Sequence, residues 1–575
     1  MFMPLLYQGR RGSSKGKNMS EPTPKINVKT LSQTERCFLD ERLEDKAEYT
    51  SASMLWGERF SLQVGIQLDR PQHDRTIVFM SVESEISEYI SLKRVDNVPV
   101  RMPLNPGADD GYYLRTEPGL FPDLLRPMSE KTRIPVMHWL AAIWVDIRIP
   151  ASSKISGEFP IRFMFKAFDG NILAETTFTV NVIAAELPEQ KIAVTQWFHA
   201  DCLAAYYGLE IFSEEHWAVI KNFIETAVDN GINMILTPIF TPPLDTAVGG
   251  ERPTVQLVDV YRKHGKWSFG FEKLERWVNM CLDCGVKYFE FSHLFTQWGA
   301  HHAPKVMAET ENGSERVFGW DTDAGGEDYR GFLTEMLPRL IAETERLGVA
   351  DRCVFHISDE PGGDMLESYL AAKNVVKDQL HGQMIMDALS DFSFYEKGVV
   401  EHPAVSEDHV KPYLEAGVPD LWVYYCCCQS EKVSNRFLSM PGARNRIIGQ
   451  MFYKYKIAGF LQWGYNFWFT QESCEFCDPY LYTDGGMWVP AGDAFSVYPA
   501  PGGSAYETLH LRGFTAALDD LRAFTLCEKL CGRDAVMAVI EERGSVAFDE
   551  YPHGDEQVLS VREKINSMIA EKIGK

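Results

Sequence analysis

The sequence lacks several features that would place it in whole classes of protein. It has no run of about 18 apolar residues, so it predicts no membrane-spanning helix. The 575 residues include only 57 basic side chains against 81 acidic ones, and the net charge of −24 disfavours phosphate backbones and anionic membranes. There is also no internal repeat and no low-complexity tract. These absences favour a soluble globular protein that binds neither nucleic acid nor membrane.

A recognisable signal peptide is also missing from the N-terminus. In MFMPLLYQGRRGSSKGKNMSEPTPKI the apolar residues 1–7 precede the basic ones, and no cleavage-like site follows. We therefore expect a disordered tail over residues 1–23, translation starting at Met19, and a cytoplasmic location. The 12 cysteines include a run of three, residues 426–428. Neighbouring cysteines pair poorly, so this usage indicates a reducing compartment and free thiols.

Metal-ligand spacing is weak throughout the chain. Cys281 and Cys284 form one CxxC pair and Cys474 and Cys477 form another, but the first lies inside the helical pattern LERWVNMCLDCG, where small buried residues suffice. The pair 301–302 (His-His) has no carboxylate at helical spacing. We predict no metal and no cofactor.

The pattern of predicted strands and helices divides the chain into two main parts. Residues 24–186 contain short β-branched or aromatic stretches separated by turn residues, such as FSLQVGIQL (60–68), FPIRFMFKAF (159–168) and AETTFTVNVIA (174–184), and predict an N-terminal β-sandwich domain. LPEQK (187–191) has the proline and charges of a linker.

From residue 192 to 535 strands alternate with helices, which predicts an α/β (β/α)8 TIM-like barrel. The expected strands are 192–198, 232–237, 286–292, 353–358, 383–388, 421–425, 458–464 and 494–498. The expected helices are 214–229, 271–284, 327–347, 364–379, 407–416, 435–456 and 504–530. Residues 536–575 form a C-terminal helical extension in this scheme.

Polar and aromatic residues gather at the expected strand ends, where such barrels carry their active sites. Rings and polar groups together are suited to sugars, because C–H faces stack on rings and hydroxyls need hydrogen-bonding partners. The predicted substrate-binding residues are Trp197, His199, Asp201, Gln297, Trp298, Asp387, Trp422, Tyr424, Trp463, Tyr465 and Asn466.

The stretch CVFHISDEPGGD (353–364) places two adjacent carboxylates, Asp359 and Glu360, after a buried strand. The pair could simply suit a helix N-terminus. Glycoside hydrolysis usually needs two separated carboxyl groups, however, and the strand end FLQWGYNFWF has none, with Glu472 several residues too late. A substrate that supplies its own nucleophile, a 2-acetamido oxygen, needs one acid and one neighbouring carboxylate instead. The pair is therefore the predicted catalytic centre.

Seven stretches together resemble glycoside hydrolase family 123 and its relatives of the domain-of-unknown-function 4091 type. They are FHADCLA, NMILTPIFTPPLDT, LFTQWGAHHAPK, HISDEP, YYCCCQ, FLQWGYNFW and GDAFSVYP, within residues 190–530. The resemblance implies a β-N-acetylgalactosaminidase with substrate-assisted catalysis. It also implies that Asp359, kept ionised, orients the acetamide and that Glu360 is the general acid/base.

Two other functions remain open from the residues. One is a glycosidase of another sugar that uses Asp201, Asp387 or Asp391 as its second carboxylate. The other is a non-catalytic carbohydrate-binding protein, for which the aromatic residues would suffice.

Individual side chains carry further expectations. His356 is expected to be a satisfied core histidine. Tyr424 and Tyr425 should point to opposite sides of their strand, whereas Trp463 and Tyr465 should share a face and could both contact a sugar. Asp493 lies in a structural segment but could reach a hydroxyl.

Overall fold

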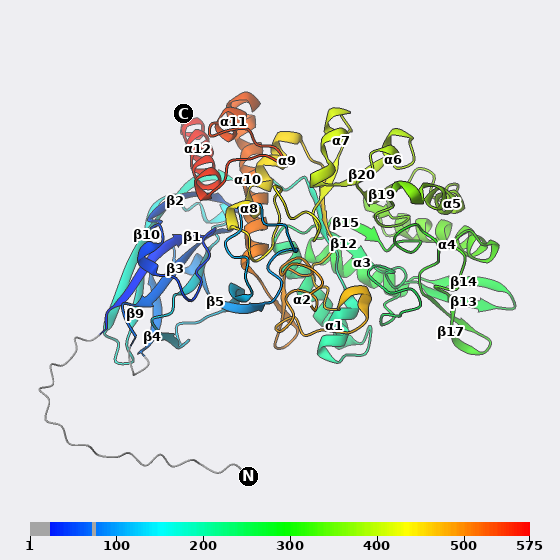
Figure 1. The fold of residues 1–575 in the computed structure, drawn as a ribbon, viewed down its shortest axis with the longest axis horizontal. Helices are drawn as coiled ribbons and strands as arrows, with labels where there is room; N and C mark the ends of the chain where they lie inside the picture. Colours follow the sequence, from blue (N-terminus) through cyan, green and yellow to red (C-terminus); the bar gives the residue numbers. More distant parts are fainter. Residues whose placement is uncertain (1–23, 72–75, 575) are drawn as a thin grey trace, which may run out of the picture.

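Two five-stranded sheets form the N-terminal part of the chain (Figure 1). The computed structural model describes residues 24–71 and 76–574, so the expected tail lies outside the described residues. One sheet has the order β1 (Ile26–Ser32), β3 (Phe60–Leu68), β8 (Ala141–Ile147), β5 (Ile90–Val100) and β6 (Gly119–Pro127). The other has the order β2 (Ser51–Trp56), β10 (Ile172–Glu186), β9 (Gly157–Lys166), β4 (Thr76–Glu83) and β7 (Ile134–Val136).

The alternation of side chains along these strands builds the core between the sheets. On β9, Ile161, Phe163 and Phe165 are buried at every second position, as a strand with one face inward requires. Inward residues of both sheets join one apolar cluster. The predicted N-terminal β-structure is therefore confirmed.

A closed barrel of eight parallel strands follows, which confirms the predicted fold class. Its strands are β11 (Ala193–Gln196), β12 (Met234–Thr237), β15 (Tyr288–Phe291), β18 (Cys353–Phe355), β19 (Met384–Leu389), β20 (His402–Ser406), β21 (Trp422–Tyr424) and β22 (Gly459–Gln462). The helices between and after them are α1 (Ala200–Tyr207), α2 (Glu214–Asp229), α3 (Glu272–Cys284), α4 (Glu327–Arg346), α5 (Leu366–Val376), α6 (Ser393–Glu396), α7 (Lys411–Glu415), α8 (Gly442–Arg446), α9 (Ile448–Tyr455) and α10 (Leu509–Cys531).

One predicted barrel strand was wrong and one strand was missed. Residues 494–498 are buried but lie beside the segment that follows β22, where Ser496 N–H donates to Tyr465 O at 2.9 Å. The missing strand is β20, which pairs with β19 and β21. It contains Pro403 and is flanked by helices of only four and five residues, so the sequence shows neither a clean strand nor a full strand–helix repeat there.

Inserted strands extend the barrel loops without entering the barrel. A four-stranded sheet has the order β14 (Lys266–Gly270), β13 (Asp259–Lys263), β16 (Val306–Thr310) and β17 (Gly313–Phe318). A two-stranded sheet consists of β23 (Tyr498–Ala500) and β24 (Ser504–Tyr506). The four-stranded insertion was not predicted from the sequence.

Two C-terminal helices, α11 (Arg533–Ile540) and α12 (Asp555–Ile573), connect the barrel to the sandwich (Figure 1). The Arg562 guanidinium on α12 donates to Asp520 on α10 at 2.9 Å and to Glu58 in the N-terminal part at 2.6 Å. The Ser53 hydroxyl on β2 donates to Glu563 at 2.7 Å. These polar contacts join the C-terminal helix to both the barrel and the N-terminal sheets. The domain boundaries expected at residues 186, 192 and 535 stay predictions. No helix within residues 24–71 and 76–574 is long and apolar enough to cross a bilayer.

All 12 cysteines are free thiols in the structure. We expect mass spectrometry to find 12 alkyl adducts when the native protein is unfolded in denaturant and alkylated without a reductant. Unfolding is needed because several thiols, including Cys202 and Cys281, are fully buried.

The control is the same sample reduced before alkylation, which should have the same mass. Two or more additional adducts after reduction would reveal native disulfides, and would contradict both the free thiols and the cytoplasmic location expected from the sequence.

Candidate functional site

A cavity of about 200 Å³ lies at the carboxyl ends of the barrel strands. Its walls combine carboxylates, indole rings and thiols. They are formed by Trp197, Asp245, Trp298, Asp359, Glu360, Ala388, Tyr424, Cys426, Cys427, Cys428, Leu461, Trp463, Gln471, Glu472 and Trp488. Both predicted catalytic residues and four of the predicted substrate-binding residues belong to this lining.

Asp359 and Glu360 are held by the two neighbours of β18, the strand β19 and the loop after β15. The Glu360 N–H donates to Ala388 O on β19 at 3.1 Å, and the Trp298 N–H from that loop donates to Asp359 O at 3.1 Å. Glu360 has a φ of +42°, a left-handed conformation that costs a non-glycine residue of order 1–3 kcal/mol. The pair therefore marks a strained turn and not a helix cap, since Gly362 is the N-cap of the 3-10 helix Gly363–Met365 that leads into α5.

The electrostatics of the pair favour retention of a proton. Burial raises the pKa of Asp359 well above its usual value, and the nearby charges of Glu360 and Asp245 raise it further. Desolvation by the surrounding protein also raises the pKa of Glu360, whose side chain remains exposed to the cavity, although the Tyr424 hydroxyl donates to its Oε1 at 2.6 Å and works in the opposite direction. The sequence predicts an ionised Asp359, whereas desolvation in this cavity favours its protonated form.

Directly beneath the pair, His356 lies between two buried carboxylates. Its Nε2 is 2.8 Å from Glu290 Oε1 and its Nδ1 is 3.3 Å from Asp387 Oδ1, and all three side chains are 0% exposed. Burial opposes a charge on the imidazole, but hydrogen bonds and attraction to Asp387 and Glu290 outweigh it and raise the pKa of His356 to about 10. His356 is thus a charged core histidine that is hydrogen-bonded through Nε2 and contacts Asp387 through Nδ1 as an ion pair without a well-aligned hydrogen bond.

Asp387 belongs to this network and does not line the cavity. It accepts hydrogen bonds from the Ile357 N–H at 3.0 Å and from the Tyr369 hydroxyl. The sequence placed Asp387 correctly at a strand end but not its direction: Ala388 lines the cavity, and Asp387, the neighbouring residue on β19, is turned toward His356 and toward Tyr369 on α5. Its oxygens are engaged with His356, Ile357 and Tyr369, which corrects the expectation of a sugar-facing carboxylate.

Two indoles of the lining are anchored by carboxylates behind them. Trp197 Nε1 donates to Glu290 Oε1 at 2.7 Å, and Trp463 Nε1 donates to Asp493 Oδ2 at 2.8 Å. Trp488 packs against Trp463 with ring centroids 5.3 Å apart. These hydrogen bonds fix the ring planes, so the cavity presents preformed aromatic surfaces of the kind that suits sugar rings.

His199, Asp201 and Asn466 hold the loops instead of the ligand. Asp201 and Arg252 form an ion pair at 2.8 Å with both side chains 1% exposed, and the Arg252 guanidinium also donates to His199 Nδ1 at 3.1 Å. Burial, together with this cation, lowers the pKa of His199 to about 3. Asn466 bonds the His199 backbone at 2.9 and 3.0 Å. The structure therefore does not bring these predicted residues to the cavity.

Gln297 and Trp422 are also outside the lining. Gln297 Oε1 accepts the Asp245 N–H at 2.7 Å, so it positions a residue that does line the cavity. Trp422 is the first residue of the three-residue strand β21, and its ring covers Gly459, where an added Cβ would lie 2.0 Å from it.

The period-2 expectation holds for one pair of aromatic residues and fails for the other. Tyr424 reaches Glu360, whereas Tyr425 is 0% exposed and packs against Phe460, as a strand requires. Tyr465 does not share the cavity face with Trp463: it is 0% exposed and its hydroxyl donates to Phe223 O at 2.9 Å. The reason is that β22 ends at Gln462, so the chain has no strand alternation at residues 463–465.

The carboxylates of the second open function are engaged elsewhere. Asp201 pairs with Arg252 and Asp387 with His356, as described above. Asp391 Oδ1 accepts the Ser393 N–H at 2.9 Å at the start of α6.

Sequence reasoning missed Asp245 and dismissed Glu472, although both line the cavity. Burial raises the pKa of Asp245 to about 7; the Arg252 charge lowers it and the Glu360 charge raises it. The two loops are tied together, since the Ala247 N–H donates to Glu472 O at 2.9 Å and the Ser473 hydroxyl donates to Asp245 O at 2.5 Å. For Asp245 the only signal in the sequence was the FTPPLDT pattern at a strand end. Glu472 was dismissed because it lies several residues after the end of its strand, but the loop folds back and brings it to the cavity.

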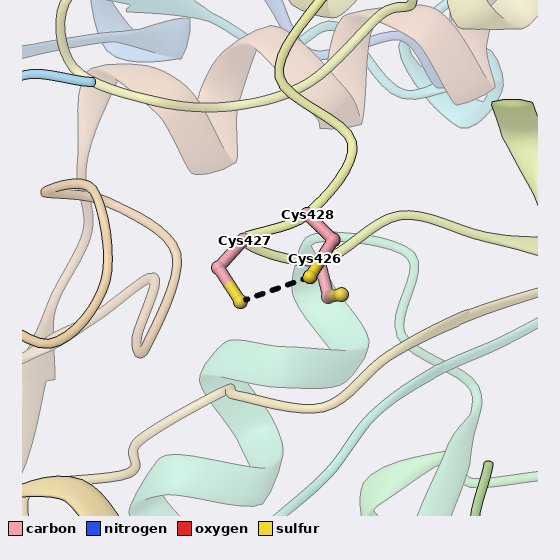
Figure 2. Close-up of side chains that lie close together, drawn as sticks. All are labelled: Cys426, Cys427 and Cys428. Carbon is pink, nitrogen blue, oxygen red and sulfur yellow. Dashed lines mark hydrogen bonds between the residues drawn. The ribbon is translucent and has the colours of Figure 1, made fainter. Parts of the chain in front are cut away.

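A turn with three thiols completes the wall beside Tyr424 (Figure 2). Hydrogen bonds from Cys426 and Cys427 lower the pKa of Cys428 to about 3. Within residues 24–71 and 76–574 two groups of possible metal ligands occur, these three cysteines and His293–His356–Asp387, and each group has its donor atoms within 4.8 Å of one another. Neither group includes the two CxxC pairs or the pair 301–302.

Known proteins point to one family. The model of the glycoside hydrolase 123 catalytic domain matches residues 197–527, a range that includes the whole cavity lining. No curated protein is significantly similar to the chain. Among solved structures, a family 123 glycoside hydrolase from Clostridium perfringens, studied for glycolipid glycan hydrolysis, aligns with a TM-score of 0.69 and 15% identity over 96% of this chain and 98% of that one. This similarity shows a shared fold.

Two other solved structures are similar to the chain only at low TM-scores. A β-glucuronidase from Parabacteroides merdae aligns with a TM-score of 0.31 and 10% identity over 86% of this chain and 52% of that one. An endo-β-1,4-mannanase from Thermotoga petrophila has a TM-score of 0.31 and 12% identity over 58% and 77%.

The buried network predicts a strong effect of Glu290→Gln. Three donors converge on this carboxylate, from Thr195, Trp197 and His356, and an amide offers only one acceptor oxygen to them. Breaking a buried ion pair on one side typically costs about 3–5 kcal/mol, so we expect thermal unfolding at a clearly lower temperature.

The matched control is Glu214→Gln, which removes an exposed ion pair with Arg276 and should change the melting temperature little. Equal melting temperatures for the two variants would show that the Glu290–His356 pair does not stabilise the barrel.

Proposed function

The chain belongs to glycoside hydrolase family 123 and is a glycoside hydrolase, and from this premise we propose that it releases a terminal β-linked N-acetylhexosamine, with N-acetylgalactosamine favoured. The proposed chemistry is substrate-assisted and retains the anomeric configuration. One observation supports it above the others: Asp359 and Glu360 are adjacent and both line the aromatic cavity. Of the carboxylates first considered as separate nucleophiles, Asp201 and Asp387 are engaged in ion pairs and Asp391 accepts the backbone N–H of Ser393.

In the proposed first step the acetamide oxygen of the bound sugar attacks the anomeric carbon. The bond between that carbon and the leaving oxygen breaks while Glu360 donates a proton to the oxygen, which leaves as an alcohol. A bicyclic oxazolinium ion remains. In the second step Glu360 takes a proton from water, the water oxygen bonds to the anomeric carbon, and the acetamide is restored. Two inversions at one carbon give net retention.

Asp359 has the positioning role in this proposal. Its carboxylate accepts the acetamide N–H and aligns the acetamide oxygen with the anomeric carbon. Such a donor stabilises the ionised form, so sugar binding opposes the burial that raises the pKa of Asp359. The resulting negative charge raises the pKa of Glu360 further. Sugar binding thus prepares Glu360 as the acid.

A second function, hydrolysis of a sugar without an acetamido group, is favoured by Asp245. This carboxyl lines the same cavity from the loop after β12, and its pKa is raised to about 7. A second carboxylate near the pair would let Asp245 serve as nucleophile or base while Glu360 remained the acid. Substrate range separates the two functions.

We place the proposed reaction in the cytoplasm, on imported oligosaccharides. The free thiols support this location, and the net charge of −24 is more compatible with a neutral carbohydrate substrate than with a polyanion.

The roles of the pair predict different responses to the leaving group. Glu360→Ala should reduce kcat/KM by about 10²- to 10⁴-fold on an alkyl glycoside, which needs a proton, and far less on a dinitrophenyl glycoside. Asp359→Ala should be slow on both, because nucleophile alignment matters whatever group leaves. The measurement is kcat/KM for each variant on each substrate.

The control for these measurements is Glu367→Ala, an exposed carboxylate on α5 outside the cavity lining, which should match the unmodified enzyme. Equal losses for Glu360→Ala on both substrates would remove it as the general acid. Near-normal rates for Asp359→Ala would contradict its positioning role.

The choice of nucleophile predicts the substrate range. If the acetamide is the nucleophile, nitrophenyl N-acetylhexosaminides should be turned over, hexosides with a free 2-hydroxyl should be very poor substrates, and an N-acetylhexosamine thiazoline should inhibit as a mimic of the bicyclic ion. Asp245→Asn should then leave detectable turnover.

Efficient turnover of plain galactosides or glucosides, abolished by Asp245→Asn and unaffected by the thiazoline, would instead establish the second function.

A further inference from the structure

Three consecutive thiols line the cavity, and neither proposed reaction uses them. Cys426, Cys427 and Cys428 follow β21 in a turn closed by the Gln429 N–H, which donates to Cys426 O at 3.2 Å. The three sulfur atoms gather on one side of this turn (Figure 2), and all lie within 4.8 Å of one another. Consecutive residues of a strand would point in alternate directions, so the turn is what brings the sulfurs together.

The spacing of the sulfurs suits a single metal ion. Zinc–sulfur bonds are about 2.3 Å long, so two sulfurs on one ion are about 3.8 Å apart in tetrahedral and about 4.0 Å apart in trigonal geometry. The Cys427 and Cys428 sulfurs are 3.9 Å apart. A disulfide would require about 2.05 Å and an oxidant, and would leave the third thiol unused.

The turn is fixed before any ion arrives. The Asn435 amide donates to Cys426 O at 2.9 Å and to Gln429 O at 2.7 Å, and the Asn105 amide, from the N-terminal part, donates to Cys427 O at 2.6 Å. The Cys426 N–H donates to Gln429 Oε1 at 2.9 Å. Little backbone entropy remains to be lost when the three sulfurs bind a common ligand.

The carboxyl groups of the cavity attract a cation, and the three sulfur atoms favour a thiophilic one. Four carboxyl groups line the same cavity, those of Asp245, Asp359, Glu360 and Glu472, and their ionised forms stabilise a cation there. Thiolates bind thiophilic ions such as Zn(II) and Cu(I) in preference to Mg(II) or Ca(II), which prefer oxygen.

We propose that Cys426, Cys427 and Cys428 form a binding site for one thiophilic metal ion at the wall of the cavity. A sulfur that binds the ion as a protonated thiol gives up its proton to solvent, and a thiolate binds directly, with no change of oxidation state in either case. The ion lies beside Tyr424 and Glu360 and occupies space in the cavity. A further consequence, which rests on the proposed function, is that the bound ion blocks glycoside hydrolysis.

The test is a titration of the reduced full-length protein with Cd(II), a spectroscopic substitute for Zn(II), in a buffer free of thiols and chelators. We expect one ion per chain and a thiolate-to-cadmium charge-transfer absorption band. In Cys427→Ser/Cys428→Ser the dissociation constant should rise by roughly 100-fold or more, since losing two ligands should exceed the roughly 10- to 100-fold effect of losing an outer-shell partner. Cys474→Ser, which removes an exposed thiol outside the cavity lining, should retain the band.

Absence of a one-to-one band, or an equal band in the double serine variant, would overturn the metal site whether or not the protein hydrolyses any glycoside. Inhibition is measured separately, as the fraction of each variant's own metal-free rate that Cd(II) removes. We expect strong inhibition of the unmodified enzyme and Cys474→Ser and little of the double variant. A tight one-to-one ion without inhibition would overturn only the blocking.

Discussion

The ionic contact of His356 with Glu290 and Asp387 is the interaction on which the rest of the site depends. Removing three ionisable groups from water is costly unless each is paired and hydrogen-bonded. Here neighbours from several elements donate to the two carboxylates: Thr195 and Trp197 donate to Glu290, and Ile357 and Tyr369 donate to Asp387. Because these partners come from β11 and the residue after it, from the residues after β18 and from α5, the network fixes the ends of the strands relative to one another. Asp359, three residues beyond His356, is positioned by that arrangement.

Backbone strain around the cavity is maintained by the same cross-loop connections. Asp245, Trp298, Glu360 and Glu472 all line the cavity and all have positive φ, between +42° and +56°. Non-glycine residues remain in this conformation only where the surroundings hold them. Hydrogen bonds between loops do so here, so the carboxylates and the exposed indole are oriented before a sugar binds. This pre-organisation reduces the ordering that binding would otherwise require.

Acidic residues at the strand ends serve two distinct purposes that composition does not separate. Asp201, Asp387 and Asp493 are 0–1% exposed and anchor Arg252, His356 and Trp463, respectively. Asp245, Asp359 and Glu360 face the cavity. The anchoring carboxylates shape the walls, and the others are available for chemistry. The same loops bring a thiol cluster to the acidic wall, where a soft cation would compete with a sugar for space.

The sequence alone determined the features that depend on local residue patterns and short motifs. Short β-branched and aromatic stretches indicated several strands of the N-terminal sheets, and alternation of strands with helices indicated seven of the eight barrel strands. Period-2 geometry placed Tyr424 and Tyr425 on opposite sides, and the adjacent acids of HISDEP belong to the cavity lining. Tertiary structure decided the remainder, because it depends on how loops fold over the barrel. Strand β20 is recognisable only by its two neighbours, since Pro403 and its short flanking helices hide it. Tyr465 turns inward where β22 has ended, and Asp245 meets Glu472 through contacts between loops far apart in the chain. Those long-range contacts decide which polar residues line the cavity and which are buried behind it. No periodicity in the sequence encodes such contacts.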